Sequence, residues 1–284
     1  MDSTVNGFSN LHPLSNFIYF FIEIGVVMFC ANPYLQLISI VCAVAYYFFL
    51  IGRWKIKKIA AFAFMSAMAA VINPLFSHQG ATIITYFPDG NPFTLESVIY
   101  GIGMGMMLLA SCVWFLVLNE VMTTEKWIHL FGKIASSLGL FFSLVLRFIP
   151  KMLKKQKEMK EYNAQESAVT RFSMLVTWGL ETSVDTADSM AARGYGLEHR
   201  SSYGIYRFGL KDALFIALCL GFGTLFFLAL HDKWISFYYY PTVQSGGTIP
   251  CYGILYVFFG IYSLLPLLLG IKENIKWNYL ESKI

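Results

Sequence analysis

The sequence predicts an all-α, polytopic membrane protein with about six transmembrane helices and a cytoplasmic pair of amphipathic helices. Composition is the first reason. Hydrophobic residues make up 57% of the 284 residues and charged residues only 13%, with a mean hydropathy of +0.57. Soluble domains are typically about 45–50% apolar and about 25% charged. Because a soluble core cannot bury this much apolar surface, lipid must solvate part of it.

The second reason is the length of the apolar runs. Six runs are long enough to cross about 30 Å of hydrocarbon at about 1.5 Å per residue. They cover roughly residues 15–31, 34–52, 59–76, 95–119, 211–230 and 251–271. Asn32-Pro33 and Asn73-Pro74 are expected to close the first and third runs, because the residue before proline disfavours helical backbone. No Lys or Arg occurs in residues 1–16, so we expect the first run to be retained as a span.

The distribution of basic residues predicts that both termini face the cytoplasm. With six spans, the inner segments hold 4, 13 and 3 Lys and Arg residues, in the order 53–58, 120–211 and 272–284. The two outer segments together hold only Lys233. Basic residues are retained on the cytoplasmic side of a membrane, which fixes this orientation.

The segment 120–210 interrupts the membrane pattern and separates the helices of 1–119 from those of 211–284. Apolar residues recur at helical spacing over 133–162, and the second half of this stretch is basic. Pro150 is expected to bend or restart that helix. Residues 133–150 are also apolar enough to enter the membrane.

A second helix is expected over about 171–193, with an apolar stripe and an acidic opposite face, and Gly194 and Gly196 end it. Arg193 then lies on its last turn, where the helix dipole favours a cation. It either caps its own helix or projects into a partner groove and meets a carboxylate. The basic helix either lies on the anionic inner leaflet or forms an interaction arm with the second helix. The acidic face of the second helix favours an arm.

Catalytic motifs do not occur in the sequence. There is no GxxxxGK[ST] phosphate loop, no HExxH pair and no GxSxG elbow. The five histidines have no metal-ligand spacing, and the five cysteines form no CxxC pair, so we expect no metal site and no disulfide framework. Gly101, Gly103 and Gly105 lie in a membrane run, where small residues favour close helix packing over phosphate binding. Glu23 is the one carboxylate clearly inside a predicted span, and it is either functional or hydrogen-bonded within the bundle.

Several short motifs resemble one known family. The string Met190-Ala191-Ala192-Arg193-Gly194-Tyr195-Gly196 resembles the Ala-Arg-Gly signature of the T component of energy-coupling factor (ECF) transporters. Leu146-Arg147-Phe148-Ile149-Pro150, followed by a charged helix, is similar to the cytoplasmic coupling region of that family. His12-Pro13, Asn32-Pro33 and Asn73-Pro74-Leu75-Phe76 fall in the matching order, so the resemblance runs from about residue 10 to 271.

The resemblance implies a non-catalytic subunit of an ABC-type importer in the bacterial cell membrane. Its partners would be two ABC-type ATPase subunits, a substrate-binding S component and the lipid bilayer, with no nucleic acid. The ATPases would bind ATP, whereas the T component would bind no cofactor itself. Movement of the ATPases would move the coupling helices, and the S component would release a vitamin or a transition-metal ion such as cobalt or nickel.

Two Xaa-Arg-Xaa motifs of that family dock on the two ATPases. The second corresponds to Ala192, Arg193 and Gly194, and Arg147 and Pro150 correspond to the support of the coupling helix. The first corresponds to Ala164, Gln165 and Glu166, where Gln165 replaces arginine. Glutamine cannot form a bidentate ion pair with a carboxylate. This departure implies a weaker contact with one ATPase, an altered partner groove, or Arg171 as the substitute.

Two other classes of protein remain as alternatives. A polytopic membrane enzyme, for instance one acting on lipid intermediates, would place several polar residues together at one membrane face. A self-sufficient secondary transporter would show paired discontinuous helices or internal repeats with midplane charges. The sequence shows no such cluster or repeat, and Glu23 stands alone.

Overall fold

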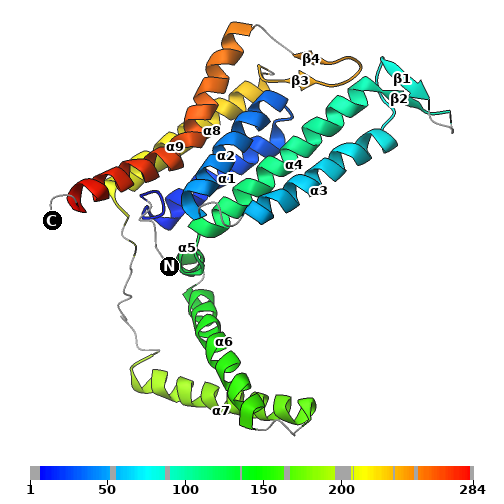
Figure 1. Ribbon diagram of the computed structural model, residues 1–284. Helices are drawn as coiled ribbons and strands as arrows, with labels where there is room; N and C mark the ends of the chain where they lie inside the picture. Colours follow the sequence, from blue (N-terminus) through cyan, green and yellow to red (C-terminus); the bar gives the residue numbers. More distant parts are fainter. Residues whose placement is uncertain are drawn as a thin grey trace. The chain divides into compact units, whose positions relative to one another are not determined.

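The computed structural model is built mainly from α-helices, with two short antiparallel β-hairpins (Figure 1). It describes residues 7–51, 56–86, 90–134, 136–162, 167–195, 206, 208–232, 234–245 and 249–281. The chain forms two compact units: unit 1 comprises Met1–Thr123 and Phe208–Ile284, and unit 2 comprises Thr124–Arg207.

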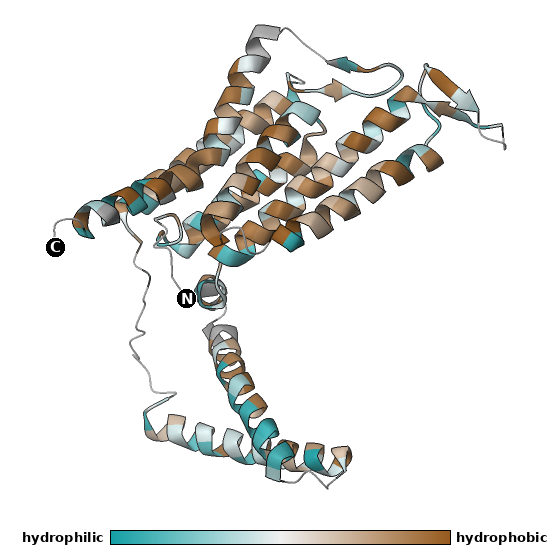
Figure 2. Ribbon diagram, viewed as in Figure 1, coloured by the Kyte–Doolittle hydropathy of each residue, from teal (hydrophilic) through white to brown (hydrophobic). Residues whose placement is uncertain are grey.

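Unit 1 contains the apolar helices. They are α1 (Pro13–Phe29), α2 (Pro33–Ile51), α3 (Ile56–Phe76), α4 (Leu95–Val121), α8 (Leu210–His231) and α9 (Ile249–Glu281). Five of them, α2, α3, α4, α8 and the part of α9 from Gly253, are long and apolar enough to cross a membrane. Figure 2 shows hydrophobic residues along all of these helices. The predicted multi-pass helical architecture is therefore confirmed in outline.

The first predicted span is shorter than the others. α1 has 17 residues, which is about 25 Å of helix. It packs against α8, α4 and α2, and its Tyr19, Phe20 and Glu23 side chains are fully buried. The number of spans and the orientation of the termini stay predictions, but α1 is a core helix of unit 1.

His12-Pro13 and Asn32-Pro33 mark the starts of α1 and α2. The Nδ1 atom of His12 accepts a hydrogen bond from the Leu14 amide at 3.2 Å, and Pro13 begins α1. The Oδ1 atom of Asn32 accepts one from the Tyr34 amide at 3.0 Å, and Pro33 begins α2. Both prolines occupy the first helical turn, where the missing N–H costs nothing. The predicted boundary at Asn32-Pro33 is confirmed.

α3 ends at Phe76, where the predicted run 59–76 ends, but it runs through Asn73-Pro74, so the expectation that this pair closes the helix is wrong. Pro74 lacks the N–H that would bond the Ala70 carbonyl. That carbonyl lies in the close contact between α3 and α4, against Gly101: a Cβ atom added at Gly101 would be 2.5 Å from it. Tertiary packing therefore accommodates the proline within the last turn of the helix.

Glycines on α4 allow α3 to approach closely. A Cβ atom at Gly105 would lie 2.8 Å from the Ser66 carbonyl oxygen and 3.0 Å from the Ala70 Cβ atom. Gly103 faces a different neighbour, the Tyr239 hydroxyl. The expectation that this glycine run serves packing is confirmed, and the small residues set the spacing of α3 and α4.

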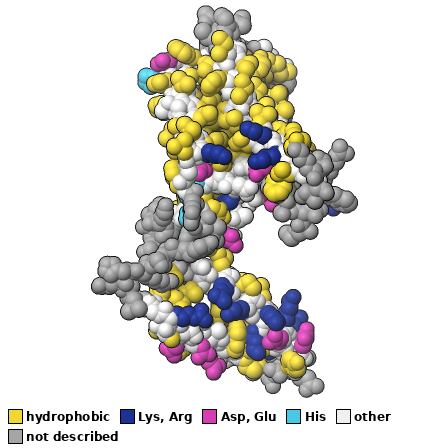
Figure 3. All heavy atoms as spheres, turned by 90° about the vertical axis from the view of Figure 1, so that its left-hand side faces the viewer, with side chains coloured by type: hydrophobic (Ala, Val, Ile, Leu, Met, Phe, Trp, Pro, Cys, Tyr) yellow, Lys and Arg dark blue, Asp and Glu magenta, His cyan; other side chains and the backbone are white. Residues whose placement is uncertain are grey.

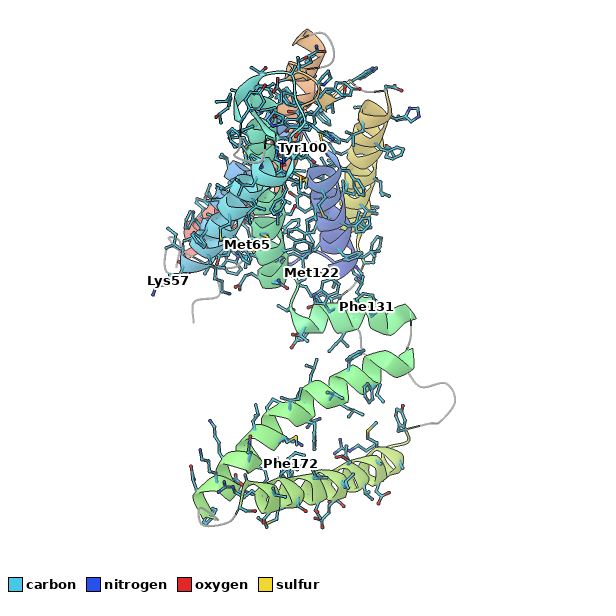
Figure 4. All side chains as sticks on the ribbon, turned by 90° about the vertical axis from the view of Figure 1, so that its right-hand side faces the viewer. Lys57, Met65, Tyr100, Met122, Phe131 and Phe172 are labelled. Atoms are coloured by element: carbon cyan, nitrogen blue, oxygen red, sulfur yellow. The ribbon has the colours of Figure 1, made fainter. Side chains whose placement is uncertain are left out.

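The two hairpins were not predicted from the sequence. β1 (Ile83–Tyr86) pairs with β2 (Pro92–Thr94) between α3 and α4, and β3 (Phe237–Tyr238) pairs with β4 (Gln244–Ser245) between α8 and α9. Tyr100 on α4, labelled in Figure 4, makes ring contacts with Tyr239 and Tyr240, at centroid distances of 5.2 and 5.5 Å. The start of α4 and the β3–β4 connection therefore lie together at one end of unit 1.

Two buried carboxylates hold chain connections. Glu96 in the first turn of α4 accepts hydrogen bonds from the amide and hydroxyl of Thr82, at 3.1 and 2.6 Å. Asp212 in the first turn of α8 accepts from the amides of Gly209 and His12, at 3.0 and 2.9 Å. Both acids also lie where the helix dipole favours a negative charge.

Unit 2 contains α5 (Thr124–Ile134), α6 (Ser136–Tyr162) and α7 (Ala168–Ala192). The expected helix over 133–162 therefore begins at Ser136, and a separate helix precedes it. α6 runs through Pro150 without a break, so a restart at that residue is wrong. Packing on α7 supports the helix across the proline, because Phe148 stacks on Trp178 with ring centroids 5.9 Å apart. α6 is not among the helices apolar enough to span a membrane within the described residues.

Candidate functional sites

The first candidate site is the C-terminal end of α7. Ser167 begins the helix as its N-cap, since its Oγ atom accepts a hydrogen bond from the Thr170 amide at 3.1 Å. Arg193 is the C-cap residue at the other end, and its side chain is exposed. Among the described residues its guanidinium group makes no hydrogen bond or ion pair. The sequence predicted that this helix ends at about Arg193, and the observed helix ends one residue earlier, at Ala192.

The backbone after Arg193 closes the helix by itself. The Gly194 amide donates to the Ala191 carbonyl, and the Tyr195 amide donates to the Met190 carbonyl, both at 3.0 Å. Gly194 has φ of 81°, a conformation that glycine adopts without strain. These are the two hydrogen bonds of a Schellman motif. Because the backbone satisfies these carbonyls, the Arg193 side chain is left for other contacts.

This geometry makes a testable prediction about Gly194. We expect Gly194→Ala to destabilise the end of α7 by about 1–2 kcal/mol, because a side chain disfavours left-handed backbone. Gly194→Asn should cost less, since asparagine tolerates that conformation. Hydrogen exchange of the Tyr195 amide checks this. Equal protection in wild type and Gly194→Ala would contradict it.

The apolar stripe of α7 divides into two parts. Leu175 and Gly179 are buried, and a Cβ atom at Gly179 would lie 3.4 Å from the Phe148 ring of α6. The other part is exposed by 38–66% and is called the α7 ridge; it consists of Phe172, Val176, Leu180 and Val184. Their spacing of four residues places them along one line of the helix. Figure 4 labels Phe172 on this helix.

A similar line of exposed apolar side chains lies on α6. The α6 ridge is 38–54% exposed and consists of Phe142, Leu146, Ile149 and Leu153. Apolar surface of this extent on a helix that is not a candidate span marks a surface that contacts a partner or lipid.

Helices α6 and α7 of unit 2 differ in net charge. The second half of α6 is mainly basic: its exposed lysines are Lys151, Lys154, Lys157 and Lys160, and Glu158 and Glu161 lie among them. α7 carries the exposed acids Glu181, Asp185 and Asp188. Figure 3 shows basic side chains gathered across the face of unit 2 in view, with acidic side chains along one edge. Unit 2 therefore presents basic, acidic and apolar surfaces side by side.

The remaining predicted docking residues occupy other positions. Arg147 and Pro150 lie on α6, both exposed. Ala164, Gln165 and Glu166, like Gly196, lie outside the described residues. The two expected docking motifs, 164–166 and 192–194, lie before and at the end of α7 in the sequence. α7 has 25 residues, so the helix between them is about 37 Å long.

The second candidate site is the buried carboxyl of Glu23 on α1. Its Oε1 atom accepts hydrogen bonds from the Ser263 hydroxyl of α9 at 2.7 Å and from the Ser39 hydroxyl of α2 at 3.4 Å. The Trp114 indole of α4 donates to Ser39 Oγ at 2.7 Å. Four helices of unit 1 therefore meet at this carboxyl.

Sequence reasoning missed a second polar residue on the same face of α1. Asn16 lies seven residues before Glu23 and is fully buried, and neither atom of its amide group has a hydrogen-bond partner among the described residues. Polar residues at i and i+7 in an apolar helix share one face. That spacing is the signal that would have found it.

The described residues contain no group of three or more His, Cys, Asp or Glu side chains that could hold a metal ion. Four described cysteines, Cys30, Cys42, Cys112 and Cys219, are free thiols. No family model matches the chain, and no curated protein matches it. The functional argument therefore rests on the two sites.

Proposed function

We propose that this chain is the transmembrane coupling (T) component of an ECF-type ABC importer in a bacterial cell membrane. It would pass the movement of two ATP-binding ATPase subunits to a substrate-binding S component that takes up a vitamin or a transition-metal ion. The observation that carries this proposal is the exposed Arg193 on a backbone-closed helix end, on the same helix as the exposed α7 ridge.

The arginine suits a docking role for a physical reason. A guanidinium group can bind a carboxylate through two parallel hydrogen bonds. An exposed pair of this kind contributes about 0–1 kcal/mol, whereas truncating a desolvated interfacial pair costs about 2–5 kcal/mol. Arg193 would therefore contribute most inside a groove on a partner, and nothing in its own helix end requires its charge.

The α7 ridge supplies the apolar part of such an interface. Fully burying one large aliphatic or aromatic side chain stabilises a complex by about 1.5–3 kcal/mol. Arginine is among the residues that are enriched in interaction hot spots, so Arg193 would add to the apolar contact of the ridge. The basic and acidic surfaces of the same unit would set the orientation of the partners.

Packing within unit 2 supports transmission of movement. Phe148 and Trp178 stack with their ring planes 15° apart, and a Cβ atom at Gly179 would lie 3.4 Å from the Phe148 ring. Close-packed helices move as one body because their side chains interdigitate. A displacement of the α7 end at Arg193 would therefore move α6 with it.

Co-purification with candidate ABC-type ATPase subunits tests the proposal. We expect the tagged chain to retain an ATPase pair in detergent and Arg193→Glu to lose it, because the substitution puts a carboxylate against the acidic groove. Lys276→Glu on α9 is the matched control, since it makes the same charge change at an exposed residue outside unit 2. Retention by Arg193→Glu equal to wild type would remove Arg193 from the interface, and failure of every ATPase pair would refute the T-component assignment.

A further inference from the structure

We propose that Glu23 is a proton-binding site inside the helix bundle of unit 1 and that Asn16 is the polar step through which its proton exchanges. The proposal concerns unit 1 alone and is independent of the coupling function, so either can fail without the other.

The two oxygens of the Glu23 carboxyl have different surroundings. Both serine hydroxyls, of Ser263 and Ser39, donate to Oε1. Oε2 is buried and has no hydrogen-bond partner among the described residues. Because two donors already occupy the lone pairs of Oε1, the proton of the neutral acid belongs on Oε2.

The charge of this carboxyl has no described partner. In the part of the chain that the structure describes, no Lys, Arg or His side chain forms an ion pair with Glu23. The described titratable side chains that interact with it are Tyr19 on α1, Cys42 on α2 and Tyr262 on α9. Tyr46 on α2 and Cys219 on α8 lie next to Tyr19. All of these are neutral at neutral pH in their ordinary range. A fully buried carboxylate without a partner charge takes up a proton instead of staying ionised.

The buried face of α1 continues the polar path from Glu23 toward the start of the helix. Tyr19, one turn away, donates to the Ser263 carbonyl at 3.3 Å, and Ser263 also bonds Glu23. Asn16 follows on the same face, about 10 Å from Glu23 along the axis. Both atoms of its buried amide group are without partners, so it can accept a hydrogen bond from one side and donate to the other.

The path ends at a polar cluster. Ser15, beside Asn16, donates from its hydroxyl to Asp212 Oδ1 at 3.5 Å, and Asp212 is 7% exposed at the start of α8. In the proposed step the O–H bond at Oε2 breaks and its electron pair stays on the carboxylate. A water molecule that enters the bundle accepts the proton and, hydrogen-bonded to the Asn16 amide, carries it toward Asp212 and solvent. Uptake of a proton reverses the step, and water is the only other reactant.

Infrared spectroscopy of the full chain in lipid tests the site. We expect the spectrum of wild type minus Glu23→Gln at neutral pH to contain the C=O stretching band of a protonated carboxylic acid, which shifts in deuterated water. If Glu23→Gln does not purify as a monodisperse protein, Glu23→Asp gives the assignment, because it keeps the acid and moves the band. A carboxylate band in that difference spectrum overturns the proposal, and a carboxylate band that responds to Na⁺ assigns the site to a metal cation.

The rate of deuterium exchange tests the path. We expect Asn16→Leu to slow the shift of the Glu23 band by at least about tenfold, which corresponds to a barrier raised by about 1.4 kcal/mol. Gln36→Leu is the matched control, because Gln36 is a second buried amide with an unpartnered atom, on α2. Gln36→Leu should exchange as wild type does. Equal slowing in both variants, or in neither, overturns the route through Asn16.

Discussion

Gly105→Leu is expected to prevent α3 from packing against α4. A Cβ atom at this position already lies 2.8 Å from the backbone oxygen of Ser66, so the added side chain meets backbone that cannot rotate away. Overpacking of a core usually costs about 1–3 kcal/mol, and a backbone contact puts this variant at the upper end of that range or above it. We expect loss of the monodisperse peak in size-exclusion chromatography, or a large fall in Tm.

Gly221→Leu on α8 is the matched control for this prediction. The structure has no atom within 4 Å of a Cβ at Gly221, so the same substitution in another apolar helix meets open space. It should purify with the Tm of wild type. If both variants behave alike, the close approach of α3 and α4 does not depend on Gly105.

The sequence predicts most of unit 1 because the bilayer imposes a simple rule. Apolar runs of sufficient length become helices, since every backbone polar group in lipid must be satisfied within the segment. The failures are local. At Asn73-Pro74 local backbone preference predicts a stop, whereas packing of the Ala70 carbonyl against Gly101 lets α3 continue. The β-hairpins are two to four residues per strand, too short for a periodic signal.

The candidate sites were predictable to different degrees. Arg193 could be placed because Gly194 follows it, and glycine marks a helix end by a simple conformational rule. The helical period predicts the apolar stripe of α7. It does not predict which residues of the stripe are buried and which are exposed, because the contact with α6 depends on Phe148 and Trp178 from different helices. The surroundings of Glu23 depend on Ser39 and Ser263, which are distant in sequence and meet only in the folded bundle.

Leu180, on the exposed α7 ridge, is expected to be needed for coupling but not for folding. We expect Leu180→Asp to abolish ATP-driven uptake by the proposed importer, reconstituted in lipid, while leaving the Tm of the chain nearly unchanged. Leu180 is 66% exposed, so an aspartate there remains solvated in the isolated chain. Exposed substitutions of this kind usually change stability by less than about 0.5 kcal/mol. In an interface, however, the same carboxylate would be desolvated without a partner.

Leu175→Asp is the contrasting variant, because Leu175 lies on the same helix and is only 6% exposed. It should lower the Tm strongly, since it buries a charge between α6 and α7. A low Tm with lost uptake identifies a structural position, and a normal Tm with lost uptake identifies a docking position. Normal uptake by Leu180→Asp would mean that the ridge contacts lipid or solvent, and the proposed coupling surface would then have to lie at Arg193 without the ridge. The two leucines, five residues apart on one helix, therefore separate the stability of unit 2 from its proposed coupling role.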